Sequence, residues 1–460
     1  MKTLPSGAIE QLKGKVKGRV LTPADPDYDA CRKIWNAMID RRPALIVQCA
    51  ESADVPHAIA AARAHGLEIS MRGAGHNIAG NAVCDDGMMI DFSRMRAVRV
   101  DVAGRRAQVE PGATLADVDA ATQAHGLATS TGINSTTGIA GLTLGGGFGW
   151  LTRTLGMTVD NLIAADIVIA DGRLLHLSAQ ENADLFWAIR GGGGNFGAVT
   201  RFEFRLRPVG PEITAGLIVF PFDQARQVLA GYRAFTAAAP EEINAWVVLR
   251  KAPPLPFLPA EVHGREVVVL AVFYPGNDAG FRELIRPLRG LGAPHGEHLA
   301  PMPYVQWQQA FDPLLAPGAR NYWKSHNFTD LSDEALEVII RYAGQLPSPQ
   351  CEILLGLTSG AANRVPAEAT AYAHRDTRFV LNVHGRWEAA TDDERCIGWS
   401  RDFFKASAPY ASAGVYVNFM TADETDRVSA AYGSNLGRLA EIKRRYDPGN
   451  VFHLNQNIRP

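Results

Sequence analysis

Three glycine-rich segments contain the residue types and spacings that could do chemistry. They are RGAGHNIAG (72–80), GIAGLTLGGGFG (138–149) and GGGGNFG (191–197). Glycine allows a positive φ and a close approach of the backbone, and successive N–H groups in such turns form concave sites for anions. Any one segment alone is better explained by a tight turn between packed elements. Three of them in one stretch of chain favour a ligand that carries phosphate groups.

The third segment resembles a dinucleotide-binding fingerprint in spacing, because Gly192, Gly194 and Gly197 satisfy GxGxxG. In a Rossmann fold that motif follows a strand and opens a helix. Here it follows the helical segment LFWAIR and opens the strand AVTRFEFRL. The Rossmann interpretation is therefore rejected. A P-loop is excluded as well, because the sequence contains neither GxxxxGKS nor GxxxxGKT.

His76 lies in the first glycine-rich segment, between Gly75 and Asn77, where a predicted strand ends. A neutral imidazole at such a place can act as a metal ligand, a base or a nucleophile. Metal binding is disfavoured, because no second histidine or carboxylate stands at ligand spacing. A role in catalysis or cofactor binding and an ordinary surface or core histidine both stay open on spacing alone.

Two further stretches place polar side chains on one face of a predicted strand. In RFVLNVHGRW, the alternation puts Asn382, His384 and Arg386 on one face and apolar residues on the other. In CEILLGLTS, Glu352 is the acidic residue of its face. If these faces line a site, they can supply a base and its acidic partner. A sheet that presents ordinary polar residues to solvent is the alternative.

The segment NYWKS is a candidate wall of the same site. Tyr322 and Trp323 could stack on a ring, and Lys324 could pair with an anionic group. Buried aromatic residues at a joint between a loop and a helix are the alternative interpretation.

The elements that must position these residues change in character near Pro208. Before it, short strands such as ALIVQC (44–49) alternate with helices, two of which end at Gly66 and Gly126. After it, proline-rich joints separate strands such as EVVVLAVFY from amphipathic helices, which predicts an antiparallel sheet backed by helices. The end of the chain combines a predicted strand at VYVNF, a helix and a polar tail, which its composition alone makes as consistent with disorder as with docking by its amides.

The composition bounds the class of protein. With 460 residues, of which 47% are hydrophobic, the chain can form two or three domains. Its 46 basic and 48 acidic residues argue against a binder of nucleic acid or of anionic membranes. No apolar run of about 18 residues and no apolar N-terminal segment occurs, so neither a membrane span nor a secretory signal is expected. Five cysteines without a CxxC pair predict neither disulfides nor zinc, and a cytoplasmic protein is expected.

Four segments in order resemble the FAD domain of the vanillyl-alcohol oxidase superfamily: RGAGHNIAG, STTGIAGLTLGGGFGWLTR, DNLIAADIVIADG and LFWAIRGGGGNFGAVTRFEF. The ending, with VYVNF and YDPGNVFHLNQNIRP, resembles the berberine bridge enzyme-like branch, and the layout is similar to that of bacterial members of the 6-hydroxynicotine oxidase type. The resemblance implies an α+β fold. It comprises a vanillyl-alcohol oxidase-type FAD-binding domain (1–207), a substrate-binding domain with an antiparallel sheet backed by helices (208–413), and a C-terminal segment (414–460) that returns to the FAD-binding domain.

The resemblance also implies FAD as the cofactor, bound covalently through the histidine of the RGxGH turn, here His76. Some members add a second bond through a cysteine, but Asn134 stands at that place and no cysteine lies between Cys84 and Cys351. A single link is therefore expected, with Cys84 as a buried free thiol. The other cofactor contacts that the resemblance implies are Arg72, Gly73, Ala74, Gly75, Asn77, Gly138, Gly141, Leu142, Gly145, Gly146, Gly149, Asn195, Val199, Asn455 and Asn457.

For catalysis, the resemblance implies that Tyr416, in the motif YxNF, takes the hydroxyl proton of an alcohol. A tyrosine needs help to act as a base near pH 7. Arg386 is expected to stabilise the tyrosinate, His384 to relay the proton and Glu352 to serve as the acidic partner. The substrate contacts are expected to be Tyr322, Trp323, Lys324 and Asn382.

These assignments predict an FAD-linked oxidase that transfers hydride from a CH–OH group of a small molecule to flavin N5 and passes the electrons to O₂, giving H₂O₂. The alternatives are an amine (C–N) oxidase, a flavin dehydrogenase with another acceptor, and a flavin-binding protein without turnover, which the tethering histidine disfavours. Asn77 and Ile78 follow His76 where sugar oxidases of the family carry a tyrosine, which weakens a sugar-oxidase assignment. The oligomeric state is left open.

Overall fold

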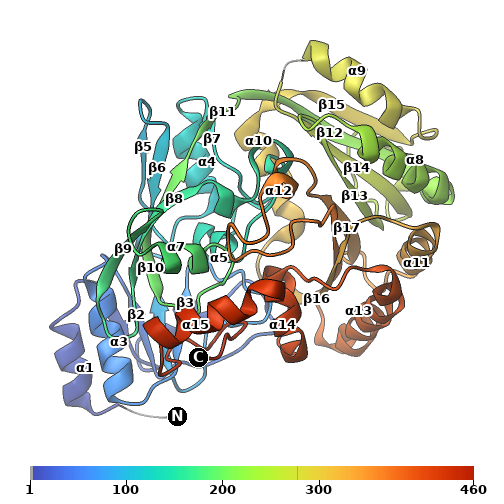
Figure 1. Ribbon diagram of the computed structural model, residues 1–460. Coiled ribbons are helices and arrows are strands. Elements are labelled where there is room, and N and C mark those ends of the chain that lie inside the picture. The colour runs from blue at the N-terminus through green and yellow to red at the C-terminus, as the bar shows by residue number, and fades with distance from the viewer. Residues whose placement is uncertain (1–3, 277) are drawn as a thin grey trace.

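Two sheets lie in the first half of the chain (Figure 1). The computed structural model describes residues 4–276 and 278–460. The four-stranded sheet has the order β1 (Arg19–Leu21), β2 (Leu45–Gln48), β4 (Met88–Asp91) and β3 (Ile69–Arg72), and only β1 runs antiparallel to its neighbour. The five-stranded antiparallel sheet has the order β5 (Val98–Asp101), β6 (Arg106–Val109), β10 (Ala198–Arg205), β8 (Leu162–Val168) and β9 (Leu174–Ser178).

Helices connect these strands much as the sequence predicts. They are α1 (Ser6–Lys13), α2 (Tyr28–Arg32), α3 (Asp54–Ala64), α4 (Leu115–Gln123), α5 (Ile139–Leu144), α6 (Thr152–Leu155) and α7 (Ala183–Ile189). The predicted glycine ends of α3 and α4 are confirmed, since Gly66 and Gly126 follow them with φ of 60° and 62°. Thr114 and Asp117 form a capping box that starts α4.

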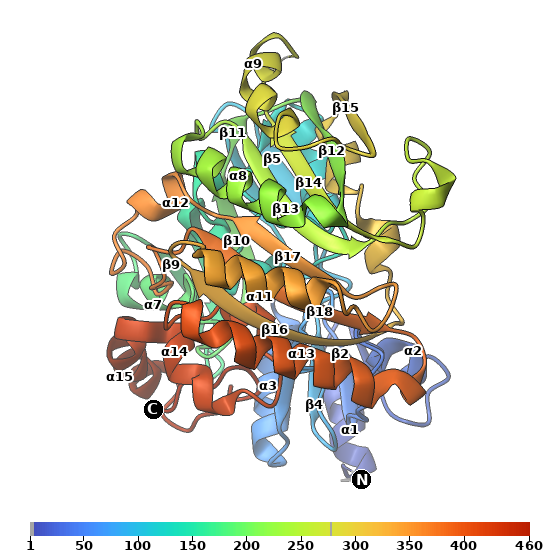
Figure 2. The same cartoon turned by 90° about the vertical axis from the view of Figure 1, so that its right-hand side faces the viewer.

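The second half contains a seven-stranded antiparallel sheet. Its order is β15 (Gly296–Pro303), β12 (Glu212–Pro221), β14 (Glu266–Tyr274), β13 (Asn244–Lys251), β17 (Glu352–Leu357), β18 (Phe379–Trp387) and β16 (Arg320–Phe328). Figure 2 shows α8 (Ala225–Ala238), α11 (Asp333–Ala343) and α13 (Asp393–Ser407) on one face of it. The remaining elements are the pair β7 (Leu127–Ala128) and β11 (Arg207–Pro208), and the helices α9 (Asp278–Arg289), α10 (Tyr304–Gln308) and α12 (Ala361–Arg364). This confirms the predicted α+β architecture.

The end of the chain packs back against the first half. After α14 (Val428–Tyr432), α15 (Leu436–Tyr446) lies beside α7 (Figure 1). The fully buried ammonium of Lys443 donates to the carbonyl oxygens of Asn195 and Phe452 and to the carboxylate of Asp447. The predicted strand at VYVNF is wrong. Residues 415 and 416 belong to no strand, and residues 417–419 form a 3₁₀ turn.

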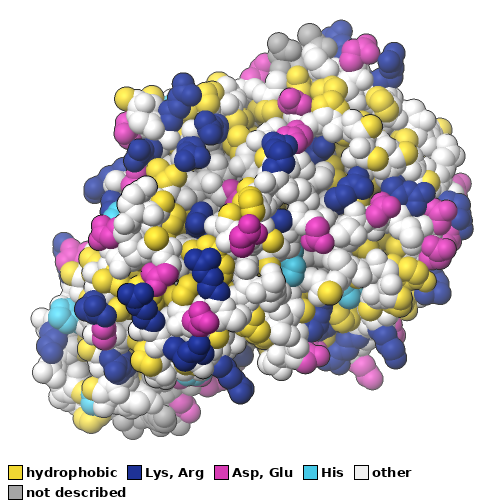
Figure 3. All heavy atoms as spheres, in the orientation of Figure 1, with side chains coloured by type: hydrophobic (Ala, Val, Ile, Leu, Met, Phe, Trp, Pro, Cys, Tyr) yellow, Lys and Arg dark blue, Asp and Glu magenta, His cyan; other side chains and the backbone are white. Residues whose placement is uncertain are grey.

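The surface carries both signs of charge. Figure 3 shows Lys and Arg side chains interspersed with Asp and Glu side chains over the face seen in Figure 1, as the near-zero net charge leads one to expect. Within residues 4–276 and 278–460, no helix combines the length and apolar character that a membrane crossing requires.

Candidate active site

A cavity of about 240 Å³ lies where the first half of the chain meets the seven-stranded sheet. It brings together four stretches that are far apart in sequence: the turn 71–77, residues 132–142, the sheet face opposite α11 and α13, and the segment 416–419. The side chains that matter below line it: Trp35, His76, Asn77, Asn134, Leu142, Trp246, Trp323, Glu352, Leu354, Asn382, His384, Tyr416 and Asn418.

His76 forms one wall of the cavity. Its ring stacks on Trp35, with 5.1 Å between centroids, and its Nε2 lies 2.9 Å from Oγ1 of Thr136. No hydrogen bond among the described residues engages the other ring nitrogen, Nδ1. Burial lowers the pKa of His76 to about 4, so the imidazole is neutral at pH 7. A neutral ring with one nitrogen held and the other free is suited to act as a nucleophile.

The turn that carries His76 has the character of an anion site. Within the described part of the chain, the backbone N–H groups of residues 74–77 donate no hydrogen bond. A Cβ added at Gly138 would meet the backbone nitrogen of Ala74 at 2.8 Å, whereas one added at Gly141 would meet nothing within 4 Å. The two glycine-rich segments therefore pack against each other and leave open backbone on the cavity side. This fits the pyrophosphate of a dinucleotide.

Arg72 is a correction to the sequence analysis. Its Nη2 and Nε bind the carboxylate of Asp91 at 2.7 and 3.0 Å, and its Nη1 donates to the carbonyl oxygens of Cys31 and Lys33. All three guanidinium nitrogens are occupied inside the protein, so Arg72 is not free to bind a phosphate. It ties the end of β3 to β4 and to the C-terminal end of α2.

The second glycine-rich segment divides into two groups. Gly138, Gly141 and Leu142 line the cavity as expected. Gly145 and Gly149 do not, because each approaches other parts of the protein closely: a Cβ at Gly145 would overlap the side chain of Asn418, and one at Gly149 would overlap the carbonyl of Thr131. These glycines make room for protein neighbours. The same holds for Gly146, whose φ is 122° and whose added Cβ would meet Tyr372.

Asn195 binds the C-terminal tail. Its Nδ2 donates to the carbonyls of Gly192 and Gln456 and to the hydroxyl of Tyr432, and its Oδ1 accepts from the N–H of Ile458. Val199 is a core residue of β10. Neither residue lines the cavity, and their contacts with the cofactor stay predictions.

The tail itself is docked. Asn455 donates from Nδ2 to the carbonyl of Phe452 at 3.2 Å. The Oδ1 atoms of Asn455 and Asn457 are buried and have no partner among the described residues. They stay candidates for a bound ligand, although neither side chain lines the cavity as the protein stands.

Glu352 and His384 face each other across β17 and β18 and form the charged part of the cavity wall. Nδ1 of His384 lies 3.2 Å from Oε1 of Glu352, and Nη1 of Arg250 donates to Oε2 of Glu352 at 2.7 Å. Burial alone would raise the pKa of Glu352, but the charge of Arg250 and the bond from His384 lower it to about 2. Burial lowers the pKa of His384 despite the nearby carboxylate. Nε2 of His384 is buried without a partner in the described structure.

Tyr416 stands at another wall, between the edges of Phe148 and Phe419, each with 4.9 Å between ring centroids. Its phenol oxygen accepts hydrogen bonds from the N–H of Gly147 at 3.1 Å and from Nδ2 of Asn418 at 3.0 Å. Burial raises the pKa of Tyr416 to about 12, against the effect of these two donors. The phenol is therefore protonated at neutral pH.

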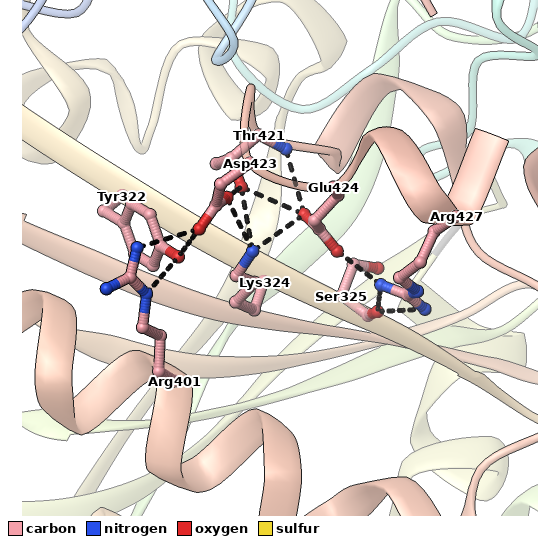
Figure 4. A network of polar contacts seen from close by, with 8 residues as sticks. All are labelled: Tyr322, Lys324, Ser325, Arg401, Thr421, Asp423, Glu424 and Arg427. Carbon is pink, nitrogen blue, oxygen red and sulfur yellow. Dashed lines mark hydrogen bonds and ion pairs between the residues drawn. The ribbon is translucent and has the colours of Figure 1, made fainter.

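Three residues of NYWKS were predicted to contact the substrate, and of these only Trp323 lines the cavity. Its ring meets the His384 ring edge-on, with 4.5 Å between the ring centroids. Tyr322 and Lys324 point to the opposite face of β16 because side chains alternate along a strand. Figure 4 shows them in a polar network, where the Tyr322 hydroxyl and the Lys324 ammonium donate to Asp423 at 2.6 and 2.8 Å. Lys324 also lies 3.3 Å from Glu424. The network fastens the segment that follows Tyr416 to the sheet.

Arg386 shares a strand face with Asn382 and His384, as predicted, but lies beyond the cavity. Its guanidinium donates to Asn321 and to the carbonyl of Ala316, and it lies 5.2 Å from the centre of the Trp35 ring. None of its contacts reaches Tyr416, so the expected role in stabilising a tyrosinate is wrong.

Three residues of the site were missed from the sequence. Asn418 is the asparagine of the YxN motif, so the motif alone could have predicted its position beside Tyr416. Arg250 pairs with Glu352 only because β13 and β17 are neighbours, in the register Arg250↔Glu352. Trp35 lies in irregular chain after α2, and no local pattern marks it.

Comparisons with known proteins agree with this geometry. Residues 43–178 match the family described as FAD binding domain, and residues 415–459 match the family described as berberine and berberine like. The chain is 30% identical to an FAD-linked oxidoreductase of Dictyostelium discoideum over 98% of its own length and 97% of the relative. It is 31% identical to (R)-6-hydroxynicotine oxidase of Paenarthrobacter nicotinovorans, over 97% of both chains. The crystal structure of 6-hydroxy-D-nicotine oxidase from Arthrobacter nicotinovorans superimposes with a TM-score of 0.85 at 28% identity, covering 97% of this chain and 98% of that one.

Proposed function

The chain belongs to the berberine and berberine-like family of FAD-linked oxidoreductases, and we propose that it oxidises a CH–OH group of a small molecule. The observation that carries the proposal is the His384–Glu352 pair, which lines the same cavity as His76 and has an unoccupied imidazole nitrogen. An alcohol must lose its hydroxyl proton as its carbon loses a hydride. A positioned neutral histidine is a common acceptor for such a proton.

The cofactor assignment uses the chain's own atoms. The N–H groups of residues 74–77 would bind the FAD pyrophosphate, and Nδ1 of His76 would form the covalent bond while Thr136 holds Nε2. When bound, the flavin supplies the hydride acceptor. We expect a single link, because Asn134 lines the cavity at the place where some family members carry a cysteine.

The hydrogen bonds support different roles for Tyr416 and His384 from those that the sequence suggested. The phenol oxygen of Tyr416 already accepts two hydrogen bonds, so its own O–H remains as a donor. His384 can donate its Nδ1–H to Glu352, which leaves the lone pair of Nε2 free to accept a proton. We assign proton acceptance to His384 and the hydrogen bond to the substrate oxygen to Tyr416.

The test is a screen of secondary alcohols with the purified holoenzyme, followed by His384→Gln. We expect kcat for the best alcohol to fall by about 10²–10⁴-fold, the usual contribution of a general base. The control is His125→Gln, which changes an exposed histidine remote from the cavity. If His384→Gln keeps its flavin and loses less than threefold in kcat, the assignment of the base is wrong.

We propose O₂ as the electron acceptor, because the relative from Paenarthrobacter nicotinovorans is named an oxidase. The prediction is that one O₂ is consumed and one H₂O₂ formed for each alcohol oxidised. An oxygen electrode and a peroxide assay measure both quantities. Turnover that proceeds with an artificial dye under nitrogen but consumes no O₂ would instead make the enzyme a dehydrogenase.

Oxidation of a C–N bond is the second candidate, favoured by the similarity to (R)-6-hydroxynicotine oxidase. An amine reacts as the neutral base and has no hydroxyl proton to lose. Turnover of an amine should therefore survive His384→Gln with little change, whereas turnover of an alcohol should not. Measuring both classes of substrate with the same two proteins separates the two candidates.

A further inference from the structure

A second cavity of about 110 Å³ adjoins the first on the same face of the seven-stranded sheet. The two cavities share Ile133, Trp246, Leu315, Glu352 and Leu354, so a ligand in one can extend into the other. We call the second cavity the annex. Nothing in the roles assigned above to His76, His384 or Tyr416 uses it.

The walls of the annex are almost entirely apolar. Strands β12, β14 and β13 supply aliphatic side chains, among them Leu217, Val248 and Val269. Aromatic rings form another wall: Trp150 packs against Trp246 at 4.8 Å and against Trp307 at 5.2 Å, measured between ring centroids, and Trp307 packs against Phe311 at 5.3 Å. Such a surface favours an apolar or aromatic ligand group.

The only charged side chains among those that line the annex neutralise each other. Arg250 and Glu352 form an ion pair of 2.7 Å at the boundary with the first cavity, and both are largely buried. A charged ligand group would lose its hydration in the annex and find no free counter-charge there, which is energetically costly. The annex therefore favours an uncharged ligand.

We infer that the annex binds the ring portion of the substrate, an uncharged aryl or alicyclic alcohol. At about 110 Å³ the annex is smaller than an apolar cavity of about 150 Å³ that holds benzene, so a ring system bound there extends into the adjoining first cavity. The inference rests on the proposed function for the place of the reacting carbon, in the first cavity beside His384. The inference that a ring binds in the annex depends only on the lining of the annex and not on the proposed reaction.

The probe for binding is 6-methoxy-2-acetonaphthone, a neutral ketone with a fused ring and an ether oxygen that cannot itself be oxidised as an alcohol. Isothermal titration calorimetry with the holoenzyme measures its Kd. Ala310→Trp places a large side chain at the exposed rim of the annex, and Gln309→Trp makes the same addition at the exposed neighbouring residue, which does not line it. We expect Ala310→Trp to weaken binding at least tenfold and Gln309→Trp to leave it unchanged.

The outcomes separate this inference from the proposed function. Absence of ketone binding to the unaltered protein, or equal binding by Ala310→Trp and Gln309→Trp, overturns the inference even if alcohols are oxidised. Ketone binding that depends on Ala310, in a protein that oxidises no alcohol, upholds the annex as a binding site and refutes the proposed reaction. Oxidation of 1-(6-methoxy-2-naphthyl)ethanol with a KM at least tenfold below that of 2-propanol, a preference that Ala310→Trp removes, supports both.

Discussion

Replacing Asp119 by Asn should make the protein more stable at alkaline pH and remove one component of its pH dependence. Asp119 lies on α4, is 1% exposed, and accepts a hydrogen bond of 2.9 Å from Nε2 of Gln308 on α10. Burial raises its pKa from 3.8 to about 7, and the bond from Gln308 only partly opposes this. Oε1 of Gln308 is buried without a partner in the described structure. An amide at residue 119 could accept from Nε2 and donate to Oε1.

The direction in which the pKa of Asp119 is shifted fixes how the stability of the folded protein changes with pH. The folded state holds the proton more tightly than the unfolded state, so the stabilisation is complete below about pH 4 and is lost as the pH rises toward 7. Asparagine does not titrate. The difference in stability between Asp119→Asn and the unaltered protein should therefore grow by about 2.5 kcal/mol between pH 5 and pH 8, an order-of-magnitude figure from the linkage relation. For a chain of 460 residues this corresponds to roughly 3 °C in Tm, at about 2 cal/mol/K of unfolding entropy per residue.

The assay is differential scanning fluorimetry of both holoenzymes at matched scan rate and ionic strength, from pH 5 to pH 8. All other titrating groups are common to the two proteins and cancel in the difference. A Tm difference that is constant over this range would refute the account, because it would mean that Asp119 does not change its protonation state on folding. Asp117→Asn is the matched control on the same helix. Its carboxylate accepts from Thr114 and Arg96, and these bonds lower its pKa below the usual 3.8, so Asp117 is ionised in both the folded and the unfolded state from pH 5 to pH 8. Asp117→Asn should therefore lower Tm by an amount that does not change over this range.

Two further predictions concern the site, and a third concerns the network around Lys324. His76→Ala should release its flavin into the supernatant on acid precipitation, whereas the unaltered protein should keep the yellow colour in the pellet; colour released from both would remove the covalent link. Glu352→Gln should move the acid limb of the kcat profile for an alcohol to lower pH, because the Glu352 carboxylate raises the pKa of His384; a limb that stays in place would show that His384 is not the titrating base. Lys324→Met should lower Tm by roughly 3 °C, since removing one partner of a buried ion pair costs about 3 kcal/mol or more and Glu424 is 3% exposed. Arg401→Met, in the exposed part of the same network, should change Tm by less than 1 °C.

Local patterns predicted the parts of the site that depend on a few consecutive residues. The alternation in β18 correctly put Asn382 and His384 on one face, because side-chain direction in a strand has a period of two. The same rule applies to NYWKS once it is known to be a strand. Trp323 must then face one side of the sheet, and its neighbours Tyr322 and Lys324 must face the other. No strand was predicted for this segment, and all three residues were offered together as candidate contacts in one wall.

Partners that are distant in sequence could not be predicted in the same way. Arg72 stands beside a glycine turn, where a guanidinium is expected to bind phosphate. Its actual partner, Asp91, is brought next to it by the parallel register of β3 and β4. Buried Asp91 requires a counter-charge, and that requirement is visible only after the strand order is known. The pairing of Arg250 with Glu352 has the same origin.

In the proposed alcohol oxidation, the charges around His384 would couple the transfer of the proton to the transfer of the hydride. With His384 neutral, Arg250 and Glu352 cancel, so the cluster has no net charge. Taking a proton at Nε2 gives the cluster a charge of +1 inside a largely buried cavity, which favours the arrival of negative charge nearby, as hydride transfer brings. Arg250 limits how strongly Glu352 holds that proton, since its charge lowers the pKa of His384. Without Arg250 the imidazolium would be paired with an unopposed carboxylate, and the base would be regenerated more slowly after each turnover.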